Sequence, residues 1–252
     1  ELMLRFFGAD VTSNKTTASI RPASELQGRK IMVPGDISSA VYFVAAGLLL
    51  PNSEVLIRNV GINPTRAGLL TVCRKMGAKL ELLNEDYSFS EPTADLLIRS
   101  GSLKGTVIDG ALIPAMIDEL PTVALMACFA EGTTIIKDAQ ELKVKESNRI
   151  AITVENLRAM GADVEETEDG MIIHGGRPLH GAVIDSHKDH RIAMTFAIAA
   201  LAAEGETEIL DADCVDISYP AFFQDLKALT ENEGCEKSDR KRSAAGHFFL
   251  YN

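Results

Sequence analysis

The residues best suited to chemistry lie in one short stretch, residues 142–149, with the sequence Leu-Lys-Val-Lys-Glu-Ser-Asn-Arg. It sets three cations and the carboxylate of Glu146 between an apolar strand-like run at 132–138 and a helix-like run at 150–160. Cations can neutralise a bound anion, and a nearby carboxylate can move a proton. A solvated charged loop has the same composition, so the rest of the chain must decide between these interpretations.

Two acidic positions elsewhere could share a site with this stretch. Asp118 precedes an apolar run at 120–130, and Asp189-His190-Arg191 precedes another at 192–203. If both runs are helices, these side chains stand at helix N-termini, where free N–H groups and the helix dipole favour anions. Arg149 and Arg191 can each bind a carboxylate or phosphate through two hydrogen bonds.

Simpler interpretations stay open for each of these side chains. Asp118 and Asp36 can serve only as helix caps, with Ser38 and Ser39 beside Asp36 as further caps or as the edge of a site. Glu146 can serve only as an ion-pair partner for Arg149 or Lys145, and Arg191 can be a surface cation.

An internal repeat supplies a common geometry for these positions. Three segments have the same order of features: a polar cluster with an Asp, an apolar helix-like run, a small turn and a strand-like run. They begin at Asp36, Asp118 and Asp189. The first two add a second helix, at 64–76 and 148–160, each ending in Met-Gly-Ala, where the glycine is a typical left-handed cap. We expect equivalent positions in the repeats to meet at one end of the fold.

The elements around the repeat favour an α/β (α+β) fold. Each Met-Gly-Ala is expected to lead into a strand, at 79–83 and at 163–166. Further strands are expected at 29–33, 96–99, 105–108, 171–174 and 182–185, and a last helix at 219–229. Strands that alternate with helices exclude an all-helical bundle. Residues 7–11 match the close of a unit whose beginning is absent.

Composition excludes several classes of protein. The 252 residues carry a formal net charge of -11, which opposes binding to nucleic acid or to an anionic membrane surface. No apolar run is long enough to cross a bilayer and no leader is recognised, so a cytoplasmic location is expected. The four cysteines form no CxxC pair, and His187 and His190 have no partner ligands nearby in sequence, so we expect no metal.

Five motifs, taken together, resemble the C-terminal part of the EPSP synthase family (3-phosphoshikimate 1-carboxyvinyltransferase). They run in order from Pro-Gly-Asp-Ile-Ser-Ser-Ala at 34–40 and Asp-Glu-Leu-Pro at 118–121, through Lys-Val-Lys-Glu-Ser-Asn-Arg at 143–149, to Asp-His-Arg-Ile-Ala-Met at 189–194 and Ser-Tyr-Pro at 218–220. The resemblance implies transfer of the enolpyruvyl group of phosphoenolpyruvate to the 5-hydroxyl of shikimate 3-phosphate, with release of phosphate. It also implies two domains of three βαβαββ units each, and no cofactor.

The resemblance implies a role for each candidate residue. Asp118 matches the aspartate that accepts the proton of the shikimate hydroxyl, and Glu146 matches the glutamate that transfers a proton to the enolpyruvyl methylene. Lys145 matches a shikimate 3-phosphate contact. Arg149 and Arg191 match the phosphoenolpyruvate-binding arginines, and His190 has a supporting role.

Two departures from the family pattern stand out. Ile217 lies where the family often has a phosphoenolpyruvate-contacting lysine, and the family's N-terminal domain has no counterpart here. We therefore expect residues 1–28 to be the end of a preceding unit and a linker, 29–229 the C-terminal domain, and 230–252 a polar tail. The chain is then a C-terminal fragment that is inactive without its N-terminal domain. A UDP-N-acetylglucosamine enolpyruvyl transferase and a non-catalytic anion-binding module are the alternatives.

Overall fold

Three buried helices form the centre of the molecule, which a computed structural model describes over residues 1–22, 25–230 and 247–250. They are α2 (Ile37–Leu49), α4 (Leu120–Cys128) and α6 (His190–Ala202), and each packs on the other two. Nearly every residue of α2 and all of α4 is buried. A helix that is apolar all round can be stable only in such a position, which explains why these runs show little amphipathic alternation.

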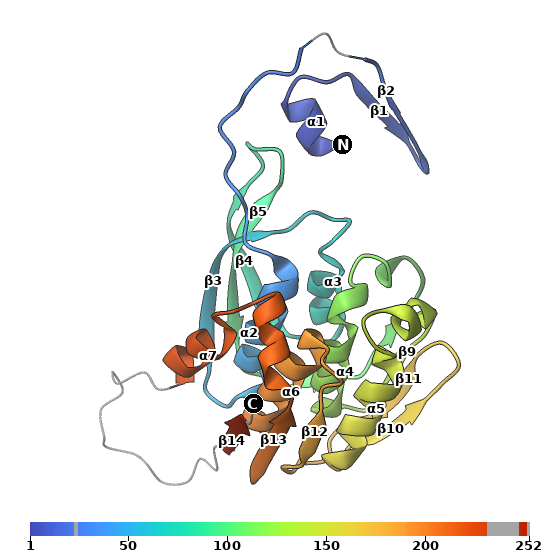
Figure 1. The fold of residues 1–252 in the computed structure, drawn as a ribbon, viewed down its shortest axis with the longest axis vertical. Helices are drawn as coiled ribbons and strands as arrows, with labels where there is room; N and C mark the ends of the chain where they lie inside the picture. The colour runs from blue at the N-terminus through green and yellow to red at the C-terminus, as the bar shows by residue number, and fades with distance from the viewer. Residues whose placement is uncertain (23–24, 231–246, 251–252) are drawn as a thin grey trace.

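Three small sheets surround the central helices (Figure 1). The first has the order β3 (Glu54–Gly61), β5 (Thr93–Arg99) and β4 (Lys79–Asp86), all antiparallel, with α3 (Gly68–Lys75) between β3 and β4. The second has the order β10 (Asp163–Glu166), β11 (Met171–His174), β9 (Thr133–Ile136) and β7 (Val107–Ile108), with α5 (Arg149–Ala159) between β9 and β10. The third has the order β12 (Val183–Asp185), β13 (Glu206–Leu210) and β14 (His247–Leu250).

The strand pairing confirms the repeat predicted from the sequence. In the second and third units a central helix joins two parallel strands, β7 to β9 and β12 to β13. In the first unit the same connection is reduced to a single parallel bridge between Gly35 and Val60. Two shorter strands, β6 (Leu103–Lys104) and β8 (Ala130–Glu131), also pair in parallel. The fold is therefore a mixed α/β repeat, as the sequence predicts.

The glycine caps and most predicted elements are confirmed. Gly77 and Gly161 have φ of +72° and +88°, so each occupies the left-handed position after its helix. The helix predicted at 148–160 forms as α5, with the Asn148 side chain accepting a hydrogen bond from the backbone N–H of Ala151. The helix predicted at 219–229 forms as α7 (Phe222–Thr230).

Three predictions about secondary structure are wrong or too long. Residues 29–33 form no strand; all five are exposed, and Pro34 cannot donate to a sheet. The helix predicted at 64–76 begins only at Gly68, because the Asn63 side chain accepts hydrogen bonds from Thr65 and closes a turn before it. Only Val107 and Ile108 of the strand predicted at 105–108 are in β7.

The N-terminal residues lie apart from the repeat, at the top of Figure 1. Helix α1 (Leu2–Phe6) is followed by Gly8 with φ +94° and by a hairpin of β1 (Val11–Asn14) and β2 (Thr17–Ile20). This order of helix, glycine and strand matches the prediction for residues 7–11. At the other end, β14 adds the last described residues of the predicted tail to the third sheet, while residues 231–246 and 251–252 lie outside the described part. Within the described ranges no helix has the length and apolar character needed to cross a membrane.

Two glycines test the packing of the second sheet. A Cβ on Gly105 would lie 2.3 Å from the carbonyl oxygen of Thr133, whereas a Cβ on Gly77 would meet nothing within 4 Å. We expect Gly105→Ala to lower the free energy of unfolding by about 3 kcal/mol, because the backbone of β9 must move. Gly77→Ala should cost about 1 kcal/mol through left-handed strain alone. Urea unfolding measures both, and equal losses would contradict the packing described for Gly105.

Candidate active site

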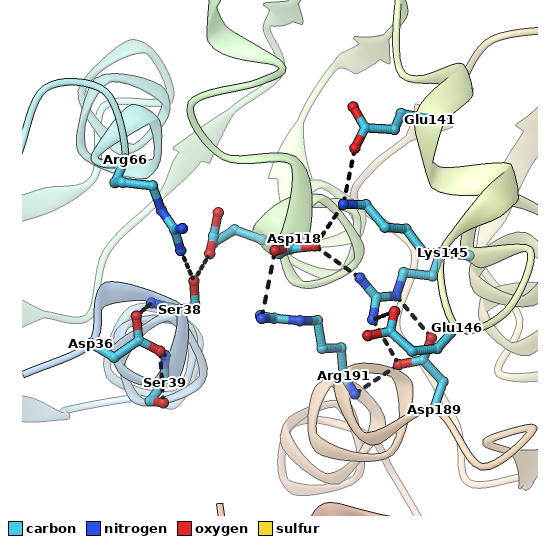
Figure 2. A network of polar contacts seen from close by, with 12 residues as sticks. Asp36, Ser38, Ser39, Arg66, Asp118, Glu141, Lys145, Glu146, Asp189 and Arg191 are labelled. Atoms are coloured by element: carbon cyan, nitrogen blue, oxygen red, sulfur yellow. Dashed lines mark hydrogen bonds and ion pairs between the residues drawn. The ribbon is translucent and has the colours of Figure 1, made fainter. Parts of the chain in front are cut away.

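The starts of α2, α4 and α6 meet at one end of the fold, as the repeat predicts (Figure 2). Asp36 caps α2 by accepting hydrogen bonds from the N–H groups of Ser38 and Ser39. Asp189 caps α6 by accepting from the N–H of Arg191. Asp118 occupies the equivalent place before α4 but lies in a 3-10 turn, Ile117–Glu119, and makes no cap hydrogen bond.

Asp118 is instead the meeting point of three cations. Its carboxylate lies 3.0 Å from Nη1 of Arg149, 3.6 Å from Nζ of Lys145 and 3.6 Å from Nη2 of Arg191. The cations come from two segments, the stretch 142–149 before and into α5 and the first turn of α6. With Glu146, which pairs with Arg149, the structure thus brings together five of the six residues predicted for the site: Asp118, Lys145, Glu146, Arg149 and Arg191.

Arg149 is fully buried and its guanidinium is held by carboxylates. Nε and Nη2 donate to the two oxygens of Asp189 over 2.8 and 3.2 Å, Nη1 donates to Asp118, and Nη2 also donates to Glu146 over 2.5 Å. Burial would lower the pKa of Arg149, but the hydrogen bonds and charge of Asp189, with the charges of Glu146 and Asp118, raise it above its usual value. An anion can reach this guanidinium only if one of its carboxylates gives way.

Asp189 is the fully buried carboxylate partner of Arg149. It has no exposed surface, and it accepts a further hydrogen bond from the Ser147 hydroxyl over 2.8 Å. Burial alone would raise the pKa of Asp189, but the hydrogen bond and charge of Arg149 outweigh burial and hold that pKa below its usual value. The sequence marks Asp189 as a repeat position at a helix start that could face the site, but assigns it no such role.

Glu146 and Lys145 face solvent more than Arg149 does. The Glu146 side chain is 53% exposed and contacts this network through its ion pair with Arg149. The Lys145 ammonium also pairs with Glu141 over 3.0 Å. Because exposed ion pairs contribute little to stability, Glu146 can leave Arg149 at small cost.

His190 lies beside this network as a buried, neutral ring. Burial is the main cause that lowers the pKa of His190, and the charge of Arg191 lowers it further. The imidazole is therefore uncharged near neutral pH and adds no positive charge to the site. Ile217, where a lysine was expected from the resemblance, is 77% exposed and also supplies no charge.

A second polar group, which the sequence did not reveal, lies on the far side of Asp118. Ser38 donates a short hydrogen bond to the carboxylate of Glu119, and Nη2 of Arg66 donates to the Ser38 hydroxyl over 3.2 Å. Ser38 was predicted only as a cap or edge residue, and Glu119 only as part of a motif. Arg66 lies in the turn before α3 and carries no signal in sequence.

The charges around Asp118 nearly cancel. Three cations, Lys145, Arg149 and Arg191, pair with four carboxylates: Asp118, Glu141, Glu146 and Asp189. Within the described residues no group of His, Cys, Asp and Glu has an arrangement that could hold a metal ion. The cluster has a central carboxylate, Asp118, a half-exposed carboxylate, Glu146, and cations that can bind an anion when their ion pairs exchange.

Comparison with solved structures defines the class of fold. The chain superimposes on an EPSP synthase from Acinetobacter baumannii with a TM-score of 0.83 at 40% identity, covering 88% of this chain and 52% of that one. It also matches the enolpyruvyl transferase NikO from Streptomyces tendae with a TM-score of 0.67 at 20% identity. This match covers 90% of this chain and 51% of that one. The chain has the enolpyruvyl transferase fold.

Comparison with families and curated sequences is more specific. The family model for EPSP synthase (3-phosphoshikimate 1-carboxyvinyltransferase) matches residues 1–226, so the chain belongs to this family. A 3-phosphoshikimate 1-carboxyvinyltransferase from Thermoanaerobacter sp. (strain X514) is 52% identical over 91% of this chain and 54% of its own length. A 3-phosphoshikimate 1-carboxyvinyltransferase from Desulforamulus reducens is 50% identical over 91% of this chain and 53% of its own length. The chain spans about half the length of these curated relatives.

Two substitutions separate the buried and exposed partners of Arg149. Asp189→Ala should lower the free energy of unfolding by about 3–5 kcal/mol, because it leaves a buried guanidinium short of its main counter-charge. Glu146→Ala removes an exposed partner of the same guanidinium and should cost less than about 1 kcal/mol. Denaturant unfolding at pH 7 measures the two values.

The pH dependence provides the control. Since the pKa of Asp189 is depressed in the folded protein, its stabilising effect is complete above about pH 4 and is lost as the pH falls through the folded value. Asp189→Asn should flatten this acid limb of the stability curve. An unchanged limb would show that the ion pair does not control it.

Proposed function

We propose that this chain supplies the acid–base groups and part of the anion-binding surface for transfer of an enolpyruvyl group. The reaction runs from phosphoenolpyruvate to the 5-hydroxyl of shikimate 3-phosphate, giving 5-enolpyruvylshikimate 3-phosphate and phosphate. The observation that carries the proposal is Asp118, a carboxylate with no capping role that three cations approach within 3.0–3.6 Å. Membership of the EPSP synthase family supplies the reaction.

The proposed chemistry divides between two carboxylates. Asp118 accepts the proton of the 5-hydroxyl while the hydroxyl oxygen bonds to the enol carbon of phosphoenolpyruvate. Glu146 donates a proton to the methylene carbon. A proton from the same methyl group then returns to the Glu146 carboxylate as the C–O bond to phosphate breaks, which releases phosphate and re-forms the enol double bond. A carboxylate that is fixed among cations suits the first role, and one that is half exposed and weakly held suits the second.

The cations have separate parts in the proposal. Lys145 contacts the phosphate of shikimate 3-phosphate, while Arg149 and Arg191 contact phosphoenolpyruvate. For Arg149 this requires Glu146 to swing away, which its exposure favours. His190 supports Arg191 as a neutral neighbour.

The proposal gives this chain the place of the C-terminal half. Residues 29–229 act as the domain, with 1–28 as the end of a preceding unit and linker and 230–252 as a tail. The remaining contacts come from the N-terminal half that the relatives also contain. A cytoplasmic location is part of the same proposal.

Activity should appear when the chain is joined to the N-terminal half of the Thermoanaerobacter relative. We expect phosphate release from phosphoenolpyruvate plus shikimate 3-phosphate, and we expect Asp118→Asn and Glu146→Gln each to lower kcat by at least 100-fold, on the scale of general acid–base catalysis. Both changes remove a charge but keep the shape of the side chain. Full activity in either variant would contradict its role, and activity with UDP-N-acetylglucosamine instead would indicate the sister reaction.

Anion binding by the 252-residue chain without the other half should be weak. The carboxylates around Lys145, Arg149 and Arg191 outnumber these cations and compete with any ligand. Glu146→Gln should tighten phosphoenolpyruvate binding about tenfold, because it releases an N–H of Arg149 from a charged partner. Glu81→Gln is a matched control, since Glu81 pairs with Arg99 away from the site. Calorimetry that finds tight binding to the unaltered chain would support the anion-binding module instead.

A further inference from the structure

Arg66 is a cation near the candidate site that the proposed function does not use. It lies in the turn before α3, and its Nη2 donates to the Ser38 hydroxyl over 3.2 Å. Within the described residues it makes no ion pair closer than 4.0 Å, whereas Lys145, Arg149 and Arg191 each pair with a carboxylate. Its charge is therefore the least neutralised among the cations around Asp118 and Glu119.

The groups that hold Arg66 are buried and polar. Ser38 and Glu119 are only 1% and 3% exposed, and the Ser38 hydroxyl both donates to Glu119 and accepts from Arg66. Burial is the main cause that raises the pKa of Glu119, although the Ser38 hydrogen bond and the charges of Arg191 and Arg66 oppose it. Glu119 reaches Arg66 only through the Ser38 hydroxyl, so it helps to hold Arg66 in place without a direct ion pair.

The Arg66 side chain and the Arg191 side chain both extend toward the turn that carries Asp118 and Glu119 (Figure 2). Arg191 approaches from α6 and lies 3.6 Å from Asp118, while Arg66 approaches from the opposite side through Ser38. Arg66 also lines a small cavity of about 50 Å³ with residues 114–119. Such a volume accommodates about three or four water-sized groups, which is enough for a carboxylate or the oxygens of one phosphate group.

We propose that Arg66 is a further anion-binding residue of this site, which acts with Arg191 to bind the oxygens of one substrate phosphate or carboxylate group on the Glu119 side of Asp118. The inference rests on the proposed function for the identity of the substrate. The N-terminus of α2 is not the binding group, because the Asp36 carboxylate already accepts from the N–H groups of Ser38 and Ser39. A planar guanidinium can hold the Ser38 hydroxyl with one N–H and still offer others to an anion.

The test follows the arginine side chains of the 252-residue chain directly. The ¹⁵N-labelled protein is titrated at constant ionic strength with phosphoenolpyruvate, inorganic phosphate and pyruvate, and the Nε–Hε resonances are followed by NMR. We expect the Arg66 and Arg191 resonances to shift with one dissociation constant. A response to phosphate but not to pyruvate assigns the phosphate group, and the reverse assigns the carboxylate.

Substitutions provide the quantitative check. Arg66→Gln should weaken phosphoenolpyruvate binding about tenfold, and Arg66→Lys, which keeps the charge but loses the planar fork, should weaken it less. Arg74→Gln is the matched control, because Arg74 is an exposed cation in the last turn of the neighbouring helix α3. It should change binding by less than twofold. Circular dichroism confirms that each variant is folded.

Two results would overturn the inference, and they differ in what else they remove. A shift of Arg191 without a shift of Arg66, together with equal binding by Arg66→Gln and Arg74→Gln, leaves the proposed function standing but excludes Arg66 from the site. If neither arginine responds to any of the anions, either in this chain or in the chain joined to the N-terminal half, the anion-binding part of the proposed function is excluded as well.

Discussion

The buried ion pair between Arg149 and Asp189 is the interaction on which the rest of the site depends. A guanidinium without exposed surface must be matched by charge and hydrogen bonds, or its burial would cost several kcal/mol. Asp189 provides this match while it also caps α6, so one side chain fixes both the start of that helix and the position of Arg149 at the start of α5. The second and third repeat units are thereby joined at the end of the fold where the candidate site lies.

The same arrangement limits what the site can bind. Arg149 is neutralised by three carboxylates, so an anion gains little until Glu146 or Asp118 moves from it. Of these, Glu146 is the most exposed, and its release uncovers an N–H of Arg149 and frees the carboxyl that is proposed to transfer a proton. One set of ion pairs thus has two uses. The buried partner, Asp189, balances the charge of Arg149, and the exposed partner, Glu146, is available for the proposed chemistry.

The sequence predicts the elements of this fold better than the contacts between them. Apolar runs, glycine caps and the repeated aspartates locate the central helices and the end at which their starts meet, because these signals are local. Residues 29–33 mislead because an apolar run looks like a strand whether or not a neighbour is present to pair with it. The pair of Glu146 with Arg149 could be predicted, because the two residues lie three apart in one segment. The contacts of Arg149 with Asp189 and of Ser38 with Glu119 could not, since each joins residues from different units.

The repeat also explains how a symmetric fold can make an asymmetric site. Asp36, Asp118 and Asp189 stand at equivalent helix starts, yet the described structure uses them differently. Asp36 has no cation paired with it in the described residues and remains a cap, whereas Asp189 is matched to a buried arginine and becomes a structural partner. Asp118 is displaced into a 3-10 turn, loses its capping bonds, and is surrounded by cations from both neighbouring segments. The helix start fixes where each aspartate lies. The cations that reach it, which for Asp118 are Lys145 and Arg149 of its own unit and Arg191 of the next, determine whether it can take part in chemistry.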